Sequence, residues 1–104
     1  MNNTKKPERI RQCAAIVCSH VAMGRKPILL AERSEPEEAS DSGWQFLCGL
    51  EEEDWTTAQV WSVHEVVEID KSLDRLVEMP IGTRLVRPAA TAEWERVPAE
   101  RDQE

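Results

Sequence analysis

Short apolar runs separated by polar turns fill the first half of the chain. Residues 13–19, CAAIVCS, and residues 28–33, ILLAER, are each too short for a stable helix, and continuous apolar runs of this length favour buried strands. Gly24 and Pro27 mark a turn between them. We therefore expect two strands that form a hairpin with a loose loop.

A third strand is predicted in the segment WQFLC, where side chains alternate between two faces. Trp44, Phe46 and Cys48 lie on one face, and Gln45 and Leu47 lie on the other. The preceding segment, SEPEEASDSG, has turn-forming residues without apolar periodicity and is expected to be a loop. The following segment, GLEEED, turns the chain again.

The second half of the chain changes to helical spacing. Ser62 and Glu65 have the spacing of a capping box, in which each side chain bonds the backbone amide of the other residue. Asp70 is placed to cap a second short helix over residues 71–79, and Pro80 ends that helix. The helical stripe, with positions three or four residues apart, consists of Val63, Val66, Val67, Asp70, Leu73, Leu76 and Val77.

The end of the chain returns to strands. Residues 82–87, GTRLVR, predict one strand, and residues 93–97, EWERV, predict a partner across the segment PAATA. The whole pattern predicts an α+β fold with a small, mainly antiparallel sheet packed by one or two short helices. We expect a flexible N-terminal segment over residues 1–11, a single domain over residues 12–97 and a polar tail over residues 98–104.

Composition limits the partners of this domain. The 104 residues include 13 basic and 20 acidic side chains, which gives a net charge of −7. Such a surface repels phosphate backbones and anionic membranes, so we expect no nucleic-acid or membrane partner. No apolar run is long enough to span a bilayer, and the start MNNTKKPERIRQ has no hydrophobic signal-peptide core behind it. The expected location is the cytoplasm.

The chemistry-bearing residues form no recognised catalytic motif. The two histidines, His20 and His64, have no neighbouring nucleophile motif, so neither a catalytic residue nor enzymatic activity is predicted. His20 follows Cys18 by two positions, and both side chains share a face if the strand continues. A thiol–imidazole pair is therefore a minor alternative.

Neither the cysteines nor the acidic run predicts a metal or cofactor. Cys13, Cys18 and Cys48 are odd in number and lack paired CxxC spacing, which indicates neither a disulfide framework nor a zinc site. We interpret them as small buried thiols, with Cys13 and Cys18 on opposite faces of one continuous strand. The carboxylates of EEED point in different directions on any regular backbone, unlike the spaced ligands of a calcium loop.

The acidic middle of the chain is the candidate docking surface. Nine acids and one base, Arg33, lie between Glu32 and Asp54. Crowded like charges repel one another, and a basic partner would relieve that repulsion and be steered toward the patch. Trp44 and Trp61 are either core residues or part of the same interface. The predicted partner-binding residues are Asp41, Glu51, Glu52, Glu53, Asp54 and Trp55.

Two segments carry a resemblance to a known family: the DSGW turn of residues 41–44 with Phe46 and Gly49, and IDKSLDRLVEMPIGT of residues 69–83. Their order and spacing resemble the DUF2185 family, also described as the Imm33 immunity-protein family. The resemblance implies a small non-enzymatic α+β domain that neutralises a toxin of a bacterial polymorphic toxin system. The residues interpreted as its structural motif are Ser42, Gly43, Trp44, Phe46, Gly49, Trp61, Asp70, Leu73, Leu76, Pro80 and Gly82.

The predicted function is therefore binding and inhibition of a cognate toxin through an acidic surface, without a cofactor. A carboxylate-rich loop would compete with phosphate for the cationic groove of a basic toxin. The alternative is a regulatory domain that binds a small molecule or a metal and uses the strand around Trp44 as a pocket wall. A third hypothesis is an enzyme that uses Cys18 and His20.

Overall fold

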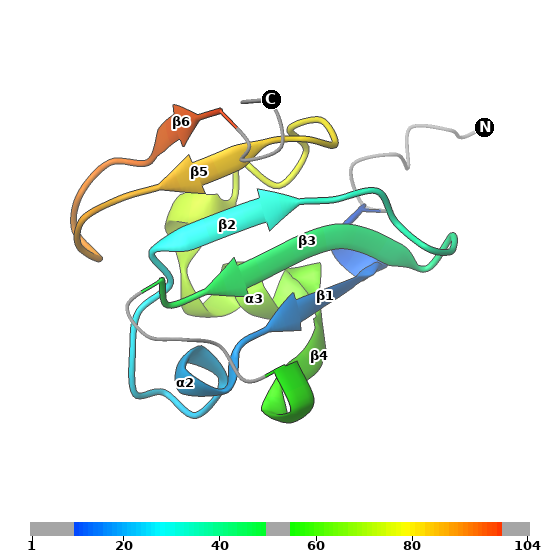
Figure 1. The fold of residues 1–104 in the computed structure, drawn as a ribbon, viewed down its shortest axis with the longest axis horizontal. Helices are drawn as coiled ribbons and strands as arrows, with labels where there is room; N and C mark the ends of the chain where they lie inside the picture. The colour runs from blue at the N-terminus through cyan, green and yellow to red at the C-terminus, as the bar shows by residue number, and fades with distance from the viewer. Residues whose placement is uncertain (1–9, 50–54, 99–104) are drawn as a thin grey trace.

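The computed structural model of the protein describes residues 10–49 and 55–98. Within these ranges, short strands alternate with short helices (Figure 1). In chain order the elements are β1 (Ala14–Val17), α2 (Ser19–Ala22), β2 (Leu30–Arg33), β3 (Asp41–Leu47), η2 (Trp55–Thr57), β4 (Gln59–Ser62), α3 (Val63–Ile69), η3 (Lys71–Leu73), β5 (Arg84–Val86) and β6 (Glu95–Val97).

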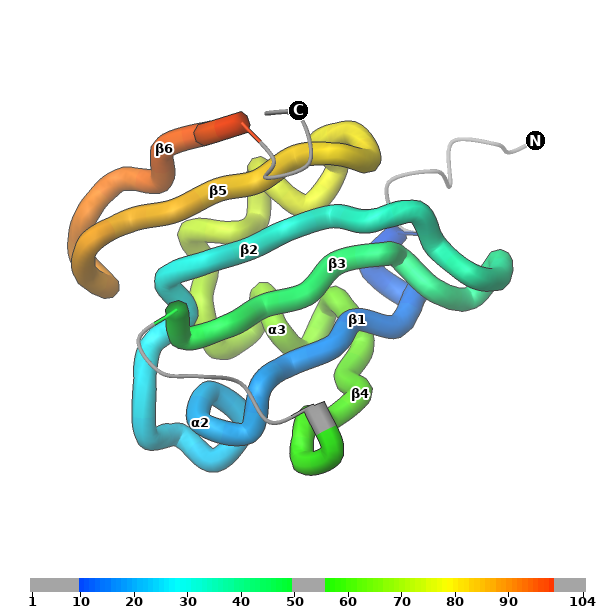
Figure 2. The backbone as a smooth tube through the Cα atoms, viewed as in Figure 1, coloured from blue at the N-terminus to red at the C-terminus, as the bar shows by residue number. Residues whose placement is uncertain are grey.

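The strands of the described residues form one six-stranded sheet in the order β4-β1-β3-β2-β5-β6. The pairing of β1 with β3 is parallel, and the other four pairings are antiparallel. Helix α3 and the chain that follows it lie on one face of this sheet (Figure 2). The predicted fold class, α+β with a small, mainly antiparallel sheet packed by short helices, is confirmed.

The predicted hairpin between the first two strands is wrong. Strand β1 lies between β3 and β4, whereas β2 pairs with β3 and β5. The connection starts with α2, a one-turn helix that the hydrophobic pattern does not predict. Gly24, at φ 75°, follows this helix and donates its amide to the Val21 carbonyl at 2.9 Å. The connection carries the chain past the position of β3, which allows β1 and β3 to run parallel.

Trp61 belongs to a strand that the sequence pattern does not predict. In β4, Trp61 lies opposite Ala15 of β1, and Val60 lies opposite Ile16. This strand is at an edge of the sheet, and Val60 is 72% exposed. Four residues at an exposed edge leave too little alternation of apolar and polar positions to indicate a strand. The helical spacing begins at Val63, the first residue of α3.

Helix α3 begins with the predicted capping box. Ser62 Oγ accepts from the Glu65 amide at 3.0 Å, and Glu65 Oε1 accepts from the Ser62 amide at 2.9 Å. Asp70 caps the next helix as predicted, because its carboxylate accepts from the Ser72 amide at 3.1 Å. The predicted helix over residues 71–79 is too long: only η3 is helical, and turns follow it.

The ends of several strands differ from the predicted ones, although β5 and β6 form the predicted antiparallel pair. Strand β3 begins at Asp41, so the expected loop over residues 34–43 ends inside a strand. Strand β1 ends at Val17, which leaves Cys13 before the strand and Cys18 after it. The expectation that these two cysteines occupy opposite faces of one continuous strand is therefore wrong.

The core lies between the sheet and α3. Trp44 and Phe46 are 1% and 0% exposed, and their rings stack with centroids 5.5 Å apart. Leu47, on the opposite face of β3, is buried as well, while Leu76 is half-buried and packs against the core. The other apolar positions of the predicted stripe are buried as expected, whereas Asp70 is half-buried; the buried positions are Val63, Val66, Val67, Leu73 and Val77. This packing fixes β3, the strand that carries the motif residues.

Candidate functional site

The DSGW turn is a β-bulge closed by a serine hydroxyl. Ala14 pairs with Asp41 and Ile16 pairs with Gln45, so β3 contains two more residues than β1 over this interval. Ser42 Oγ donates to the Ala14 carbonyl at 2.6 Å and accepts from the Trp44 amide at 3.0 Å. The hydroxyl therefore makes the contacts that the interrupted backbone ladder leaves open.

Gly43 is required at its position in this bulge. Its φ is 84°, in the left-handed region that favours glycine. A Cβ atom at residue 43 would lie 2.0 Å from the carbonyl oxygen of Ser34, whose amide donates to the Gly43 carbonyl at 2.8 Å. No side chain fits in this space.

Asp41 has a structural role in the same turn. Its Oδ1 accepts from the Gly43 amide at 2.9 Å, and its Oδ2 accepts from the Glu37 amide at 3.2 Å. Asp41 is the first residue of the seven-residue β3, which ends at Leu47 and at about 3.3 Å per residue is roughly 20 Å long. The acidic residues with which Asp41 was grouped lie outside the described residues.

Trp44 is a core residue, which resolves the alternatives left open for it. Its indole Nε1 donates to the Val77 carbonyl at 2.7 Å and thereby ties β3 to the segment after η3. Arg33 Nε donates to the Ser42 carbonyl at 2.8 Å, and Arg33 Nη1 donates to the Met79 carbonyl at 2.7 Å. Because Trp44 and Phe46 are almost fully buried, their rings do not wall a surface pocket.

The remaining motif residues also serve the fold. Trp61 is half-buried against the core, and its Nε1 donates to Gln59 Oε1 at 3.1 Å. Pro80 accepts from the Thr83 amide at 3.1 Å, which closes the turn that follows η3. Gly82 and Gly49 have φ angles of 98° and 68°, where glycine is favoured. These positions shape turns at the ends of strands.

The structure contains a buried arginine that the sequence pattern does not predict. Arg87, which follows β5, donates from Nη2 to Asp70 Oδ2 at 2.5 Å, from Nη1 to Ser72 Oγ at 3.2 Å and from Nε to the Ile28 carbonyl at 3.0 Å. Its guanidinium lies 4.2 Å from the ring centroid of Trp94, whose Nε1 donates to Ser72 Oγ at 2.9 Å. No local spacing in the sequence indicates that this arginine is buried.

The predicted acidic surface is only partly covered by the structure. Glu51, Glu52, Glu53 and Asp54 lie outside the described residues, and Trp55 is described only as the first residue of η2. Glu32 forms a half-buried ion pair with Arg84 at 2.6 Å, so it is part of the sheet. The acids that are exposed between β2 and β3 are Glu35, Glu37 and Glu38.

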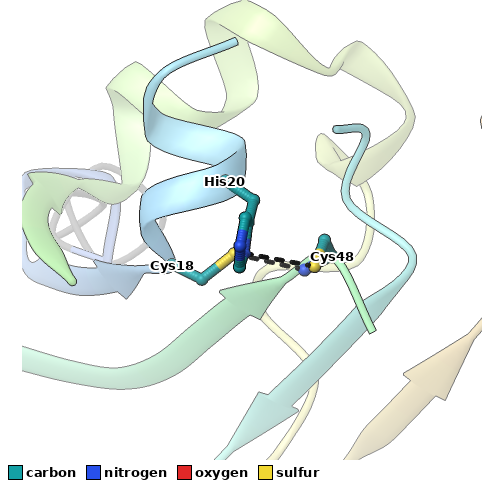
Figure 3. A group of neighbouring side chains, drawn as sticks. All are labelled: Cys18, His20 and Cys48. Carbon is teal, nitrogen blue, oxygen red and sulfur yellow. Dashed lines mark hydrogen bonds between the residues drawn. The ribbon is translucent and has the colours of Figure 1, made fainter. Parts of the chain in front are cut away.

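Two cysteines and a histidine lie together at one end of the sheet (Figure 3). One ligand atom from each of Cys18, His20 and Cys48 lies within 4.8 Å of the others. Cys48 Sγ is 3.7 Å from His20 Nδ1, and the Cys48 amide donates to Cys18 Sγ at 3.3 Å. The strand does not continue through His20, as the thiol–imidazole alternative required. The first turn of α2 instead brings the imidazole back toward both thiols.

The other cysteine and histidine lie elsewhere. Cys13 contacts the Ala39 carbonyl at 3.7 Å and is half-buried, so the buried-thiol interpretation holds for Cys18 and Cys48 but not for Cys13. The His64 side chain is 60% exposed and lies 3.6 Å from Glu68 on the surface of α3. Both residues lie outside the cluster formed by Cys18, His20 and Cys48.

A hollow of about 450 Å³ lies beside α2. It is bordered by α2, β4 and the end of α3, with Trp61 and Ile69 among its lining residues. Among the described residues, no helix has the length and apolar character needed to cross a membrane.

Fold and site together define a small α+β domain in which the polar motif residues hold the bulge and the turns. The chain matches the family model for the immunity protein Imm33 domain over residues 15–98, and it belongs to this family. The resemblance in the DSGW turn and in residues 69–83 is thereby confirmed. No curated protein and no solved structure matches the chain. Membership implies a cognate toxin as partner, and immunity proteins are generally non-enzymatic.

Proposed function

We propose that this protein is an immunity protein that binds a cognate bacterial toxin and neutralises it. The observation that carries the proposal is the family match over residues 15–98. The motif residues hold the bulge and the core and form no recognised catalytic arrangement, which is compatible with a binding role. The proposal places the protein in the cytoplasm, where its three thiols would stay reduced.

The proposed binding surface is the acidic segment Glu51, Glu52, Glu53 and Asp54 with the adjacent Trp55. Four consecutive carboxylates next to an indole combine a charged rim with an aromatic anchor, as in many interface hot spots. The net charge of −7 complements a basic toxin and would steer its approach. Asp41 is left out of this surface, because both of its carboxylate oxygens already accept hydrogen bonds within the turn.

The mechanism follows from charge and geometry. Carboxylates placed over a cationic substrate groove form charge-assisted hydrogen bonds with its arginines and lysines. These bonds compete with the phosphate groups of a nucleic-acid substrate, so the toxin is inhibited by occlusion.

The test uses the protein encoded next to this one as the candidate toxin. We expect the triple variant Glu51→Ala, Glu52→Ala, Glu53→Ala to bind it at least about tenfold more weakly, mainly through a slower association rate. The control is Glu35→Ala, Glu37→Ala, Glu38→Ala, which removes the same charge from the exposed segment between β2 and β3. Equal losses in both variants would show a net-charge effect, and unchanged binding in the first would exclude the acidic segment.

Neutralisation itself has a separate readout. Cells that express the toxin should survive when they also express the wild-type protein. Failure of the wild-type protein to bind or rescue against its neighbour's product would contradict the immunity role, whatever surface is used.

A further inference from the structure

We propose that Cys18, His20 and Cys48 form a zinc-binding site. Zinc bonds of about 2.3 Å to sulfur and 2.0–2.1 Å to nitrogen in a tetrahedron place sulfur and nitrogen ligands about 3.5 Å apart, and two sulfurs about 3.8 Å apart. The observed separation of Cys48 Sγ from His20 Nδ1 is 3.7 Å, and all three ligand atoms lie within 4.8 Å of one another. Shifts of side-chain torsions alone would bring them to coordination distance.

The fold explains why residues so far apart in sequence meet. Strands β1 and β3 are parallel neighbours, so the carboxyl ends of both strands lie at the same end of the sheet. Cys18 directly follows β1, and Cys48 directly follows β3. The Cys18 amide donates to the Phe46 carbonyl at 3.1 Å, which extends the pairing of the two strands up to the cluster. Both thiols are therefore attached to rigid backbone.

The helix supplies the third ligand, and the two thiols are buried. Cys18 occupies the N-cap position of α2, and His20 is in its first turn. Figure 3 shows the side chains of Cys18, His20 and Cys48 turned toward one another. Cys18 and Cys48 are 1% and 0% exposed, whereas His20 is half-buried, so an ion would enter from the histidine side.

The donor set selects a borderline or soft metal. Thiolate and imidazole are the usual zinc ligands, whereas calcium and magnesium require oxygen donors. Binding would release one proton from each thiol, and His20 would coordinate through neutral Nδ1. The Cys48 amide already donates to Cys18 Sγ, a contact that stabilises a thiolate. Three protein ligands leave the fourth tetrahedral position to a water molecule.

The sequence alone indicates no zinc site, because its cysteines lack paired CxxC spacing. The cluster becomes visible only when the two strand ends are placed side by side. The proposed zinc site does not depend on the proposed toxin binding, because none of its ligands belongs to the acidic segment.

The experiment titrates the full-length protein, in the presence of a non-thiol reductant, with Co²⁺ and then with Zn²⁺. We expect one Co²⁺ per chain, with thiolate-to-metal absorption and tetrahedral ligand-field bands that Zn²⁺ abolishes. His20→Asn and Cys48→Ser should each weaken Zn²⁺ binding by more than about 100-fold, since loss of an outer-shell partner alone costs about 10- to 100-fold. Circular dichroism verifies that each variant is folded, and His20→Asn is the decisive one because His20 is only half-buried.

Matched controls come from the same chain. Cys13→Ser and His64→Asn remove a thiol and an imidazole outside the cluster and should leave the affinity unchanged. Absence of stoichiometric binding at micromolar Zn²⁺, binding unaffected by His20→Asn, or a Cys18–Cys48 disulfide that persists under reductant would each overturn the proposal.

Discussion

Asp70 and Arg87 form an ion pair that joins two distant parts of the fold. The Arg87 side chain is 2% exposed and the Asp70 side chain is 18% exposed. Asp70 also accepts from the amide and the hydroxyl of Ser72, at 3.1 and 2.6 Å, so one carboxylate caps η3 and neutralises the buried guanidinium. The pair therefore couples the helical segment to the end of β5.

The first prediction concerns this pair. Asp70→Ala leaves Arg87 buried without its counter-charge and should lower the free energy of unfolding by about 3 kcal/mol, because breaking a buried pair typically costs 3–5 kcal/mol and Asp70 is partly exposed. Glu68→Ala, which removes the exposed contact with Lys71 at 3.5 Å, is the control and should change stability by less than about 0.5 kcal/mol. Urea denaturation measures both, and similar values for the two variants would contradict the coupling role.

The second prediction compares two glycines with similar backbone angles. Gly43→Ala should destabilise the protein by about 2–5 kcal/mol, from the left-handed backbone and from the overlap with the Ser34 carbonyl. Gly24→Ala should cost only about 1–2 kcal/mol, because its φ is 75° but no atom lies within 4 Å of the added Cβ. Equal losses would mean that the bulge relaxes around the new methyl group.

The third prediction concerns Thr83, which is 1% exposed. Among the described residues its hydroxyl has no hydrogen-bond partner. Thr83→Val keeps the shape of the side chain, removes the cost of burying that hydroxyl and should stabilise the protein by about 1 kcal/mol. Thr83→Ser keeps the hydroxyl, loses a methyl group and should destabilise by about 1 kcal/mol. A loss of stability in Thr83→Val would contradict the cost assigned to the buried hydroxyl.

Features that depend on nearby residues could be predicted from the sequence. The capping box needs only the three-residue spacing of Ser62 and Glu65, and the cap at Asp70 needs only the two residues that follow it. The apolar stripe through Val63 and Val77 reflects helical spacing even where η3 gives way to turns. Each of these contacts closes a short loop, so sequence spacing specifies it.

Features that depend on strand order could not be predicted in this way. The hairpin prediction assumed that successive strands pair, but β1 pairs with β3 and β4. The contacts of Cys48 with His20 and Cys18 span 28 and 30 residues and exist only because β1 and β3 are parallel. The burial of Arg87 likewise depends on Asp70, 17 residues earlier. Tertiary pairing, rather than local spacing, decides these positions.

The fourth prediction tests the capping box as a cooperative pair. Ser62→Ala removes the hydroxyl that accepts from the Glu65 amide and should lower stability by about 1 kcal/mol, which for a domain of this size is a fall in Tm of roughly 4–8 °C. Ser40→Ala, at an exposed position outside any helix, is the control and should leave Tm nearly unchanged. Glu65→Ala should add little once Ser62 is replaced, because the two bonds fix the same helix start. Fully additive losses in the double variant would show that the two bonds act independently. Negligible losses in both single variants would show that α3 is held in place by the burial of Val63, Val66 and Val67 rather than by its cap.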